Sequence, residues 1–329
     1  MPVELGPDPT GESAREDRIM STHVTAEIAS QPACWRRAAE TADREAARLP
    51  RRGERVAVVG CGTSYFIARA YAALRESLGA GETDAFPASD RTPLGRGYDR
   101  IVALTRSGTT TEVVNLLAGA AGRIPTVVLT GVPDSPAGRL ADETVDLAFA
   151  DERSVVQTRF ATTALQLLRA GLGVDLAPAI ADAELVLYER LPAVWERRGQ
   201  FTFLGTGWTV GLADEAALKV REVARAWTES YAAMEYRHGP ISISDRTSLV
   251  CCLGPAPSGL RDEVESTGAL FAADAIDPVA ALVRAQRLAV ALADRRGLNP
   301  DRPRHVSRSV ILAGAFRPTV SDATRILRS

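Results

Sequence analysis

Short apolar runs alternate with helically spaced apolar residues along the first half of the chain. The expected strands lie at residues 55–59, 101–105, 126–130 and 145–148. The expected helices follow at residues 24–49 (broken near Pro32), 63–78, 110–121 and 156–172. Continuous apolar strands separated by helices are typical of a parallel sheet that is buried on both faces.

The same pattern restarts after a polar helical stretch at residues 181–198. Strands are expected at residues 201–204, 248–253 and 269–272, and helices at 210–228 and 279–296. Gly60 and Gly205 each end a strand and open a helix, which suggests an internal duplication. We therefore expect an α/β fold of two tandem units, residues 23–180 and 181–329, each a parallel sheet between two helical layers. Residues 1–22 are polar and are expected to form a disordered leader.

Composition narrows the possible functions. The chain has 39 basic and 41 acidic residues among 329, a net charge of −2, so there is no electrostatic case for nucleic acid or an anionic membrane as partner. No apolar run reaches the length of a membrane span. Three histidines and four cysteines lack metal-site spacing, so we expect no metal and no cofactor. Reduced thiols and a cytoplasmic location are the corresponding expectations.

Two hydroxyl-rich turns follow expected strands of the first half. Gly62, Thr63 and Ser64 come directly after the first strand, and Thr105 to Thr110 follow the second. Glycines admit a ligand close to the backbone, and hydroxyls beside a helix start suit a phosphate. Plain helix capping explains either turn alone. Both turns at the carboxyl ends of one parallel sheet favour phosphate binding, because ligands of such sheets bind there.

A second cluster surrounds the only lysine of the chain, Lys219. Glu215, Lys219 and Glu222 fall at positions i, i+4 and i+7 and so share one face of the expected helix 210–228. One interpretation is a solvent-exposed Glu–Lys stripe. The other is a catalytic face, because a carboxylate base beside a cation, with His238 on a nearby Gly-Pro turn, suits proton abstraction next to a carbonyl.

The motifs taken together resemble the sugar isomerase (SIS) family over residues 25–312. The segments that carry the resemblance are Glu27-Ile28-x3-Pro32, Gly60-Cys-Gly-Thr-Ser64, Ser107-Gly108-x-Thr110, Ala217-Leu218-Lys219-x2-Glu222, Glu235-x2-His238-Gly239-Pro240 and residues 301–310. Within this family, the chain resembles the isomerase half of glutamine–fructose-6-phosphate aminotransferase and stand-alone amino-sugar-phosphate isomerases and deaminases.

The resemblance implies two tandem SIS domains, a homodimer, and a phosphorylated sugar or amino sugar as ligand. It implies that the sugar phosphate is held by Gly62, Thr63, Ser64, Thr105, Ser107 and Thr110, with Arg106 and Val155 lining the pocket. Glu222 is then the base that moves a proton between C1 and C2, and His238 assists ring opening. Lys219 and Glu215 lie beside the reacting carbons in this assignment.

Three departures from the family pattern bear on the reaction. The residues contain no glutaminase domain, and Arg106 stands where the family has a neutral residue. Arg308 matches the position of an imine-forming lysine, and a guanidinium cannot form an imine. Deamination with isomerisation of an amino-sugar phosphate, or plain aldose–ketose isomerisation, is therefore the leading interpretation. A deglycase acting on a fructosamine phosphate and a non-catalytic phosphosugar-binding module are the alternatives.

Overall fold

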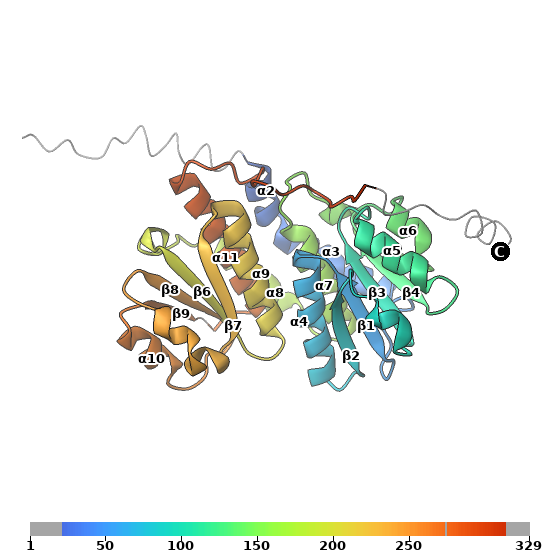
Figure 1. The fold of residues 1–329 in the computed structure, drawn as a ribbon, viewed down its shortest axis with the longest axis horizontal. Coiled ribbons are helices and arrows are strands. Elements are labelled where there is room, and N and C mark those ends of the chain that lie inside the picture. The colour runs from blue at the N-terminus through green and yellow to red at the C-terminus, as the bar shows by residue number, and fades with distance from the viewer. Residues whose placement is uncertain (1–21, 274, 314–329) are drawn as a thin grey trace, which may run out of the picture.

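The computed structural model describes residues 22–273 and 275–313 as an α/β protein with two parallel sheets flanked by helices (Figure 1). The first sheet has the strand order β2-β1-β3-β4-β5. Its strands are β1 (Val56–Gly60), β2 (Thr83–Pro87), β3 (Arg100–Thr105), β4 (Thr126–Thr130) and β5 (Glu143–Asp146). Its helices are α2 (His23–Ala29), α3 (Gln31–Arg44), α4 (Thr63–Ser77), α5 (Thr111–Ala120), α6 (Pro136–Leu140) and α7 (Arg159–Gly171), with short 3-10 turns at Thr92–Gly95 and Ala148–Ala150.

The second sheet has the strand order β7-β6-β8-β9. Its strands are β6 (Gln200–Gly205), β7 (Trp227–Ala232), β8 (Ser248–Leu253) and β9 (Leu270–Ala273). The helices around it are α8 (Ala177–Tyr188), α9 (Thr209–Ala224), α10 (Leu260–Ser266) and α11 (Pro278–Arg295), with 3-10 turns at Trp195–Arg197, Glu235–His238 and Pro240–Ile243.

The two sheets repeat one arrangement, as the sequence suggested. In each, the first strand along the chain pairs with the second on one side and with the third on the other. The strand-to-helix turns also match: a Cβ on Gly60 would lie 2.6 Å from the carbonyl carbon of Ser64, and one on Gly205 would lie 2.3 Å from the carbonyl oxygen of Thr209. Only glycine fits where the following helix approaches its strand this closely.

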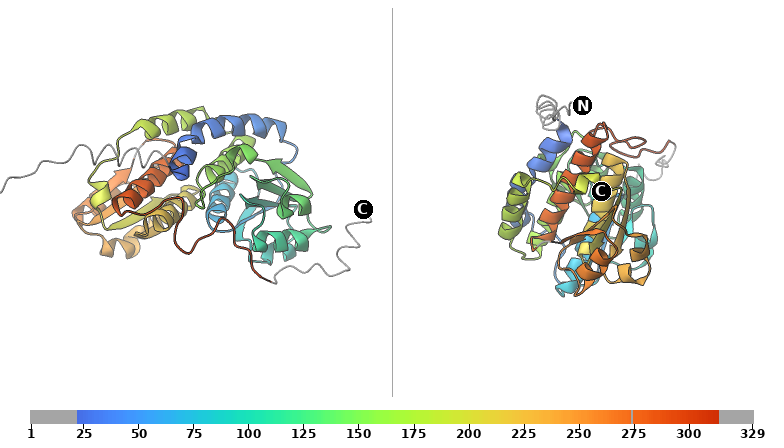
Figure 2. Two further views of the ribbon diagram at one scale, coloured as in Figure 1. Left: turned by 90° about the horizontal axis from the view of Figure 1, so that it is seen from above. Right: turned by 90° about the vertical axis from the view of Figure 1, so that its left-hand side faces the viewer.

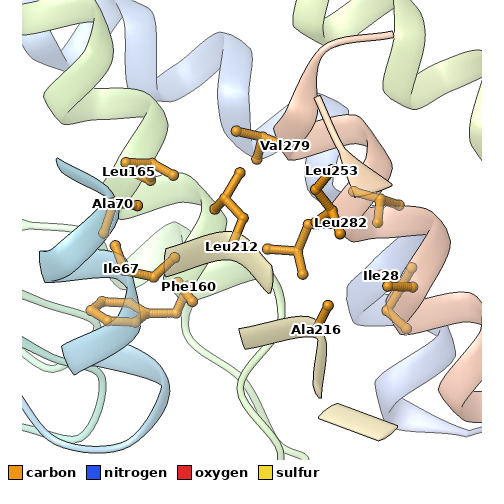
Figure 3. Packing of buried hydrophobic residues seen from close by; sticks show 14 of the residues in the cluster. Ile28, Ile67, Ala70, Phe160, Leu165, Leu212, Ala216, Leu253, Val279 and Leu282 are labelled. Atoms are coloured by element: carbon orange, nitrogen blue, oxygen red, sulfur yellow. The ribbon is translucent and has the colours of Figure 1, made fainter. Parts of the chain in front are cut away.

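One apolar core is shared by the two sheets. Helix α4 of the first unit packs against α9 of the second, while α7 packs on α4 and α11 on α9, so these helices form a layer between the sheets (Figures 1 and 2). The side chains that meet there include Ile67, Ala70, Phe160, Leu165, Leu212, Ala216, Val279 and Leu282 (Figure 3). The outer faces are covered separately, by α5 and α6 on the first sheet and by α10 and the turn at 235–238 on the second. The relative position of α4 and α9 is therefore fixed by buried apolar surface.

Gly211 marks the closest approach of α9 to α4. A Cβ there would lie 2.6 Å from the carbonyl oxygen of Phe66 and 2.7 Å from the amide nitrogen of Ala70. We expect Gly211→Ala to lower the free energy of unfolding by about 1–3 kcal/mol, because the two helix backbones must separate. Gly199→Ala, where an added Cβ meets nothing within 4 Å, is the matched control and is expected to be neutral. Equal urea midpoints for both variants would contradict this account of the helix contact.

The chain after α11 returns to the first unit. Residues 296–313 leave α11, follow the upper edge of the molecule in Figure 1 and end beside α5. The carboxylate of Asp301 accepts hydrogen bonds from the amides of His23 and Val24, and the amide of Thr111 donates to the carbonyl of Val310 at 3.1 Å. We name residues 305–312 the C-terminal segment; it belongs to sequence assigned to the second unit but lies on the first.

Most of the expected elements are present, and the differences have local causes. The strands β2 and β7 were not expected, because both are edge strands with polar or half-exposed residues and show no apolar run. The helix expected at 210–228 ends at Ala224, because Arg225 adopts a left-handed conformation with φ of 51°. The short helix α10 was also missed. The expected division at residues 180 and 181 falls inside α8, and residues 1–21 lie outside the described part. No helix among the described residues is long and apolar enough to cross a membrane.

Candidate active site

Lys219 joins the two clusters that the sequence had singled out separately. It projects from α9, and its Nζ donates to Oγ1 of Thr63, the first residue of α4, at 3.0 Å. Thr63 belongs to the hydroxyl-rich turn after β1, where Gly62 has a φ of 54° that favours glycine. The packing of α9 against α4 therefore places the face of Glu215, Lys219 and Glu222 against the expected phosphate cradle.

The charged residues of this face are removed from solvent. The Nζ of Lys219 lies 2.5 Å from Oε2 of Glu222 and 3.5 Å from Oε1 of Glu215. The side chains of Glu215 and Lys219 are 0% and 1% exposed, whereas that of Glu222 is 18% exposed. The interpretation as a solvent-exposed stripe is therefore wrong. Glu222 is the member of the cluster that a ligand can reach.

Burial changes the proton affinity of the cluster. Burial raises the pKa of Glu215 to about 8, and the negative charge of Glu222 adds to this, while the ammonium of Lys219 opposes it. For Lys219, burial alone would lower the pKa, but the attraction of Glu215 and Glu222 outweighs it and raises the pKa overall. Lys219 is thus a protonated amine at neutral pH, and Glu215 can hold a proton there.

The raised pKa of Glu215 predicts how stability depends on pH. The folded pKa of about 8 lies above the ordinary value of 4.5, so the folded protein holds an extra proton between these pH values. Stability is then expected to fall as pH rises from 4.5 to 8, by at most about 1.4 kcal/mol per pH unit. Glu215→Gln should flatten this slope. Urea unfolding of both proteins at pH 5, 6, 7 and 8 tests it, and parallel slopes would contradict the assignment.

The second hydroxyl-rich turn faces the C-terminal segment. Oγ1 of Thr109 lies 3.0 Å from Oγ of Ser107 and 2.9 Å from Oγ of Ser309, and Thr110 lies 3.4 Å from the same Ser309 oxygen. A pocket of about 410 Å³ opens between the turn and the segment. It is lined by Ser107, Thr109, Val132, Ser307, Arg308, Ser309 and Ile311. Its hydroxyls and one guanidinium are groups that hydrogen-bond an anion.

Arg106 does not line this pocket, although the sequence placed it among the ligand-binding residues. Its side chain is 1% exposed, and its guanidinium donates to the carbonyl of Val155 and pairs with Glu152. The Oγ1 of Thr105 accepts a hydrogen bond from the amide of Gly108 at 3.2 Å, so the side chain of Thr105 stabilises the Ser107 turn. Arg308 pairs with Asp151 and is about one third exposed.

His238 is not bonded to these groups among the residues that the structure describes. It is exposed, in the 3-10 turn Glu235–His238 that follows β7, and makes no hydrogen bond or ion pair with Glu222, Lys219 or Thr63 among the described residues. Its role in ring opening stays a prediction.

Four residues near the site were not singled out by sequence. Gln157 accepts from Ser64 at 3.5 Å, Asp151 holds Arg308, and Thr109 and Ser309 bond to each other. The sequence signal was weak, because Gln157 and Asp151 lie in a loop without regular spacing. Thr109 was passed over between Ser107 and Thr110, although it has the same chemistry as its neighbours.

Comparisons with known proteins agree with the family resemblance seen in the sequence. Residues 51–170 match the family model of the SIS domain. The chain is 29% identical over 311 residues to the isomerizing glutamine–fructose-6-phosphate aminotransferase of Methanothermobacter thermautotrophicus, covering 78% of this chain and 51% of that protein. The same enzyme of Pyrococcus horikoshii is 27% identical over 321 residues, covering 80% and 53%. The chain spans about half the length of these curated relatives.

Solved structures share the fold. Glucosamine-6-phosphate deaminase from Thermotoga maritima superposes with a TM-score of 0.73 at 24% identity, covering 88% of this chain and all of that one. Tagatose-6-phosphate ketose/aldose isomerase from Escherichia coli has a TM-score of 0.74 at 19% identity, covering 89% and 96%. At these identities the structural likeness speaks for the fold alone.

Proposed function

Since this chain carries a SIS domain at residues 51–170, we propose that it is a phosphosugar aldose–ketose isomerase that releases ammonia from an amino-sugar phosphate. The curated relatives are isomerizing aminotransferases of fructose 6-phosphate, and one structural neighbour is a glucosamine-6-phosphate deaminase. A substrate of the glucosamine 6-phosphate type is consistent with both. Arg308 in place of an imine-forming lysine argues against the aminotransferase reaction itself.

One observation carries the proposal: the Lys219 ammonium touches both Glu222 and the turn that would hold the phosphate. The distances from Nζ are 2.5 Å to Glu222 and 3.0 Å to Thr63. A carboxylate base, a fixed positive charge and a hydroxyl of the first hydroxyl-rich turn lie within one side chain of each other, which suits proton transfer on a phosphorylated carbonyl compound. A module that only binds phosphosugars has no use for a buried cation beside a reachable carboxylate.

The residues take the following roles in this proposal. Ser64, Ser107 and Thr110 hold the phosphate by hydrogen bonds from their hydroxyls. Glu222 takes the proton from C2 of the open-chain amino aldose and returns it to C1. Water then hydrolyses the resulting imine at C2, and ammonia leaves. Lys219, whose pKa is raised by Glu215 and Glu222, stabilises the negative charge that develops on O1 during the transfer.

Two incubations test the proposal. Purified protein is mixed with glucosamine 6-phosphate, or with fructose 6-phosphate plus ammonia, and both ammonia and the sugar phosphates are followed. Release of ammonia together with formation of fructose 6-phosphate is expected. If neither mixture reacts but a phosphosugar raises the melting temperature, the chain is a binding module. If only a fructosamine phosphate is turned over, it is a deglycase.

A further inference from the structure

The guanidinium of Arg106 ties together two segments that are far apart in sequence. Its Nη1 donates to the carbonyls of Ser154 at 3.1 Å and Val156 at 3.3 Å, and its Nη2 donates to the carbonyl of Val155 at 3.0 Å. The same Nη2 donates to the carbonyl of Arg308, in the C-terminal segment, at 3.0 Å. A planar guanidinium can hold several carbonyls in fixed directions, which neither lysine nor glutamine can do.

Glu152 connects Arg106 to the N-terminus of α7. Its Oε2 lies 3.4 Å from Nη1 of Arg106, and its Oε1 accepts from the amides of Thr158 at 2.6 Å and Arg159 at 2.8 Å, where α7 begins. Arg106 and Glu152 are 1% and 0% exposed, so both charges are neutralised inside the protein by each other and by backbone groups. The start of α7, the loop 152–156 and the C-terminal segment therefore share one anchor.

The C-terminal segment forms one wall of the pocket beside the Ser107 turn. Ser307, Arg308, Ser309 and Ile311 belong to the segment, and Ser107 and Thr109 face them. The segment is also held by the ion pair of Arg308 with Asp151 and by hydrogen bonds of Ser309 to Thr109 and of Leu312 to Thr111. The bond from Arg106 is made by a charged donor in the interior, and such bonds are stronger than neutral ones.

We propose that Arg106 is a positioning residue that holds the C-terminal segment against the Ser107 turn and so sets the affinity for the phosphorylated ligand without touching it. The part that concerns affinity rests on the proposed function, since it takes the Ser107 turn to hold the phosphate. The part that concerns the segment does not. Arg106 follows β3 directly. It therefore links the edge of the sheet that carries the Ser107 turn to the C-terminal segment.

Hydrogen exchange and ligand affinity, measured on the full chain, test the two parts separately. Arg106→Gln is expected to speed amide exchange in the C-terminal segment by about tenfold, as expected for one lost hydrogen bond to a charged donor. The KM for glucosamine 6-phosphate should rise about tenfold while kcat changes little. Arg106→Lys should not restore either value, because an ammonium cannot reach both sets of carbonyls.

Arg75 provides a matched control. It is a second fully buried arginine that donates to backbone carbonyls, of Glu54 at 3.0 Å and Arg51 at 2.5 Å, but at the opposite edge of the same sheet. Arg75→Gln should lower stability without changing exchange of the C-terminal segment or KM. Equal effects of the two variants would overturn the proposal, as would unchanged exchange in Arg106→Gln.

A double variant tests the same role without leaving an unpaired buried charge, which could by itself prevent Arg106→Gln from folding. Arg106→Gln combined with Glu152→Gln replaces the buried ion pair by two neutral amides and leaves no unpaired charge. The same faster exchange is expected, because the bond to the carbonyl of Arg308 is still lost. If wild-type protein binds no phosphosugar, the proposed function fails while the exchange result still decides the role of Arg106.

Discussion

Replacing Glu222 by glutamine is expected to lower kcat for glucosamine 6-phosphate by about a thousandfold, the size of effect typical for loss of a general base. The amide keeps the shape of the carboxylate and can still hydrogen-bond, but it cannot accept the C2 proton. Binding should persist, because Ser64 and Ser107 and not Glu222 hold the phosphate in our assignment. KM is therefore expected to stay within a few-fold of wild type.

Steady-state kinetics with ammonia detection measures this effect. Glu184→Gln serves as the control, since Glu184 is a residue of α8 with a half-exposed side chain that pairs with Arg36 of α3. It should leave kcat and stability nearly unchanged. Full activity of Glu222→Gln would remove Glu222 as the base and with it the proposed mechanism.

Replacing Lys219 by methionine is expected to reduce kcat by about a hundredfold, as does the removal of one preorganised donor from other active sites. It should also destabilise the protein, by about 3 kcal/mol at pH 9, because Glu215 is ionised at that pH and loses its buried cationic partner. The loss should be smaller at pH 6, because Glu215 is then protonated and needs no cation. Urea unfolding at both pH values, alongside kinetics, separates the two effects.

The same geometry predicts that Lys219 forms no imine with substrate. Its amine is held by Glu222 and Thr63 and stays protonated, since its pKa is raised, and an ammonium is not a nucleophile. Borohydride reduction in the presence of fructose 6-phosphate should leave the mass of the Lys219 peptide unchanged. A reduced adduct on that peptide would contradict the electrostatic role assigned here.

Local pattern was sufficient for much of the fold and for the family. The apolar runs predicted β1, β3, β4, β6 and β8, because central parallel strands are apolar on both faces. The edge strands β2 and β7 were not predicted. In β7, for example, Glu229 and Tyr231 are only half-buried, so the strand contains no continuous apolar run. The motif Glu215-x3-Lys219-x2-Glu222 identified a candidate site, but two interpretations of it stayed open.

What the sequence by itself determined was the alternation of strands and helices, the two hydroxyl-rich turns and the residues on one face of α9. These depend on contacts between residues close in sequence, and such contacts leave periodic patterns. Only the tertiary structure decided that Lys219 is buried against Thr63, 156 positions away, and that the buried guanidinium of Arg106 donates to the carbonyls of Val155 and Arg308. Burial and long-range hydrogen bonds arise from the packing of whole helices, and no local pattern records them.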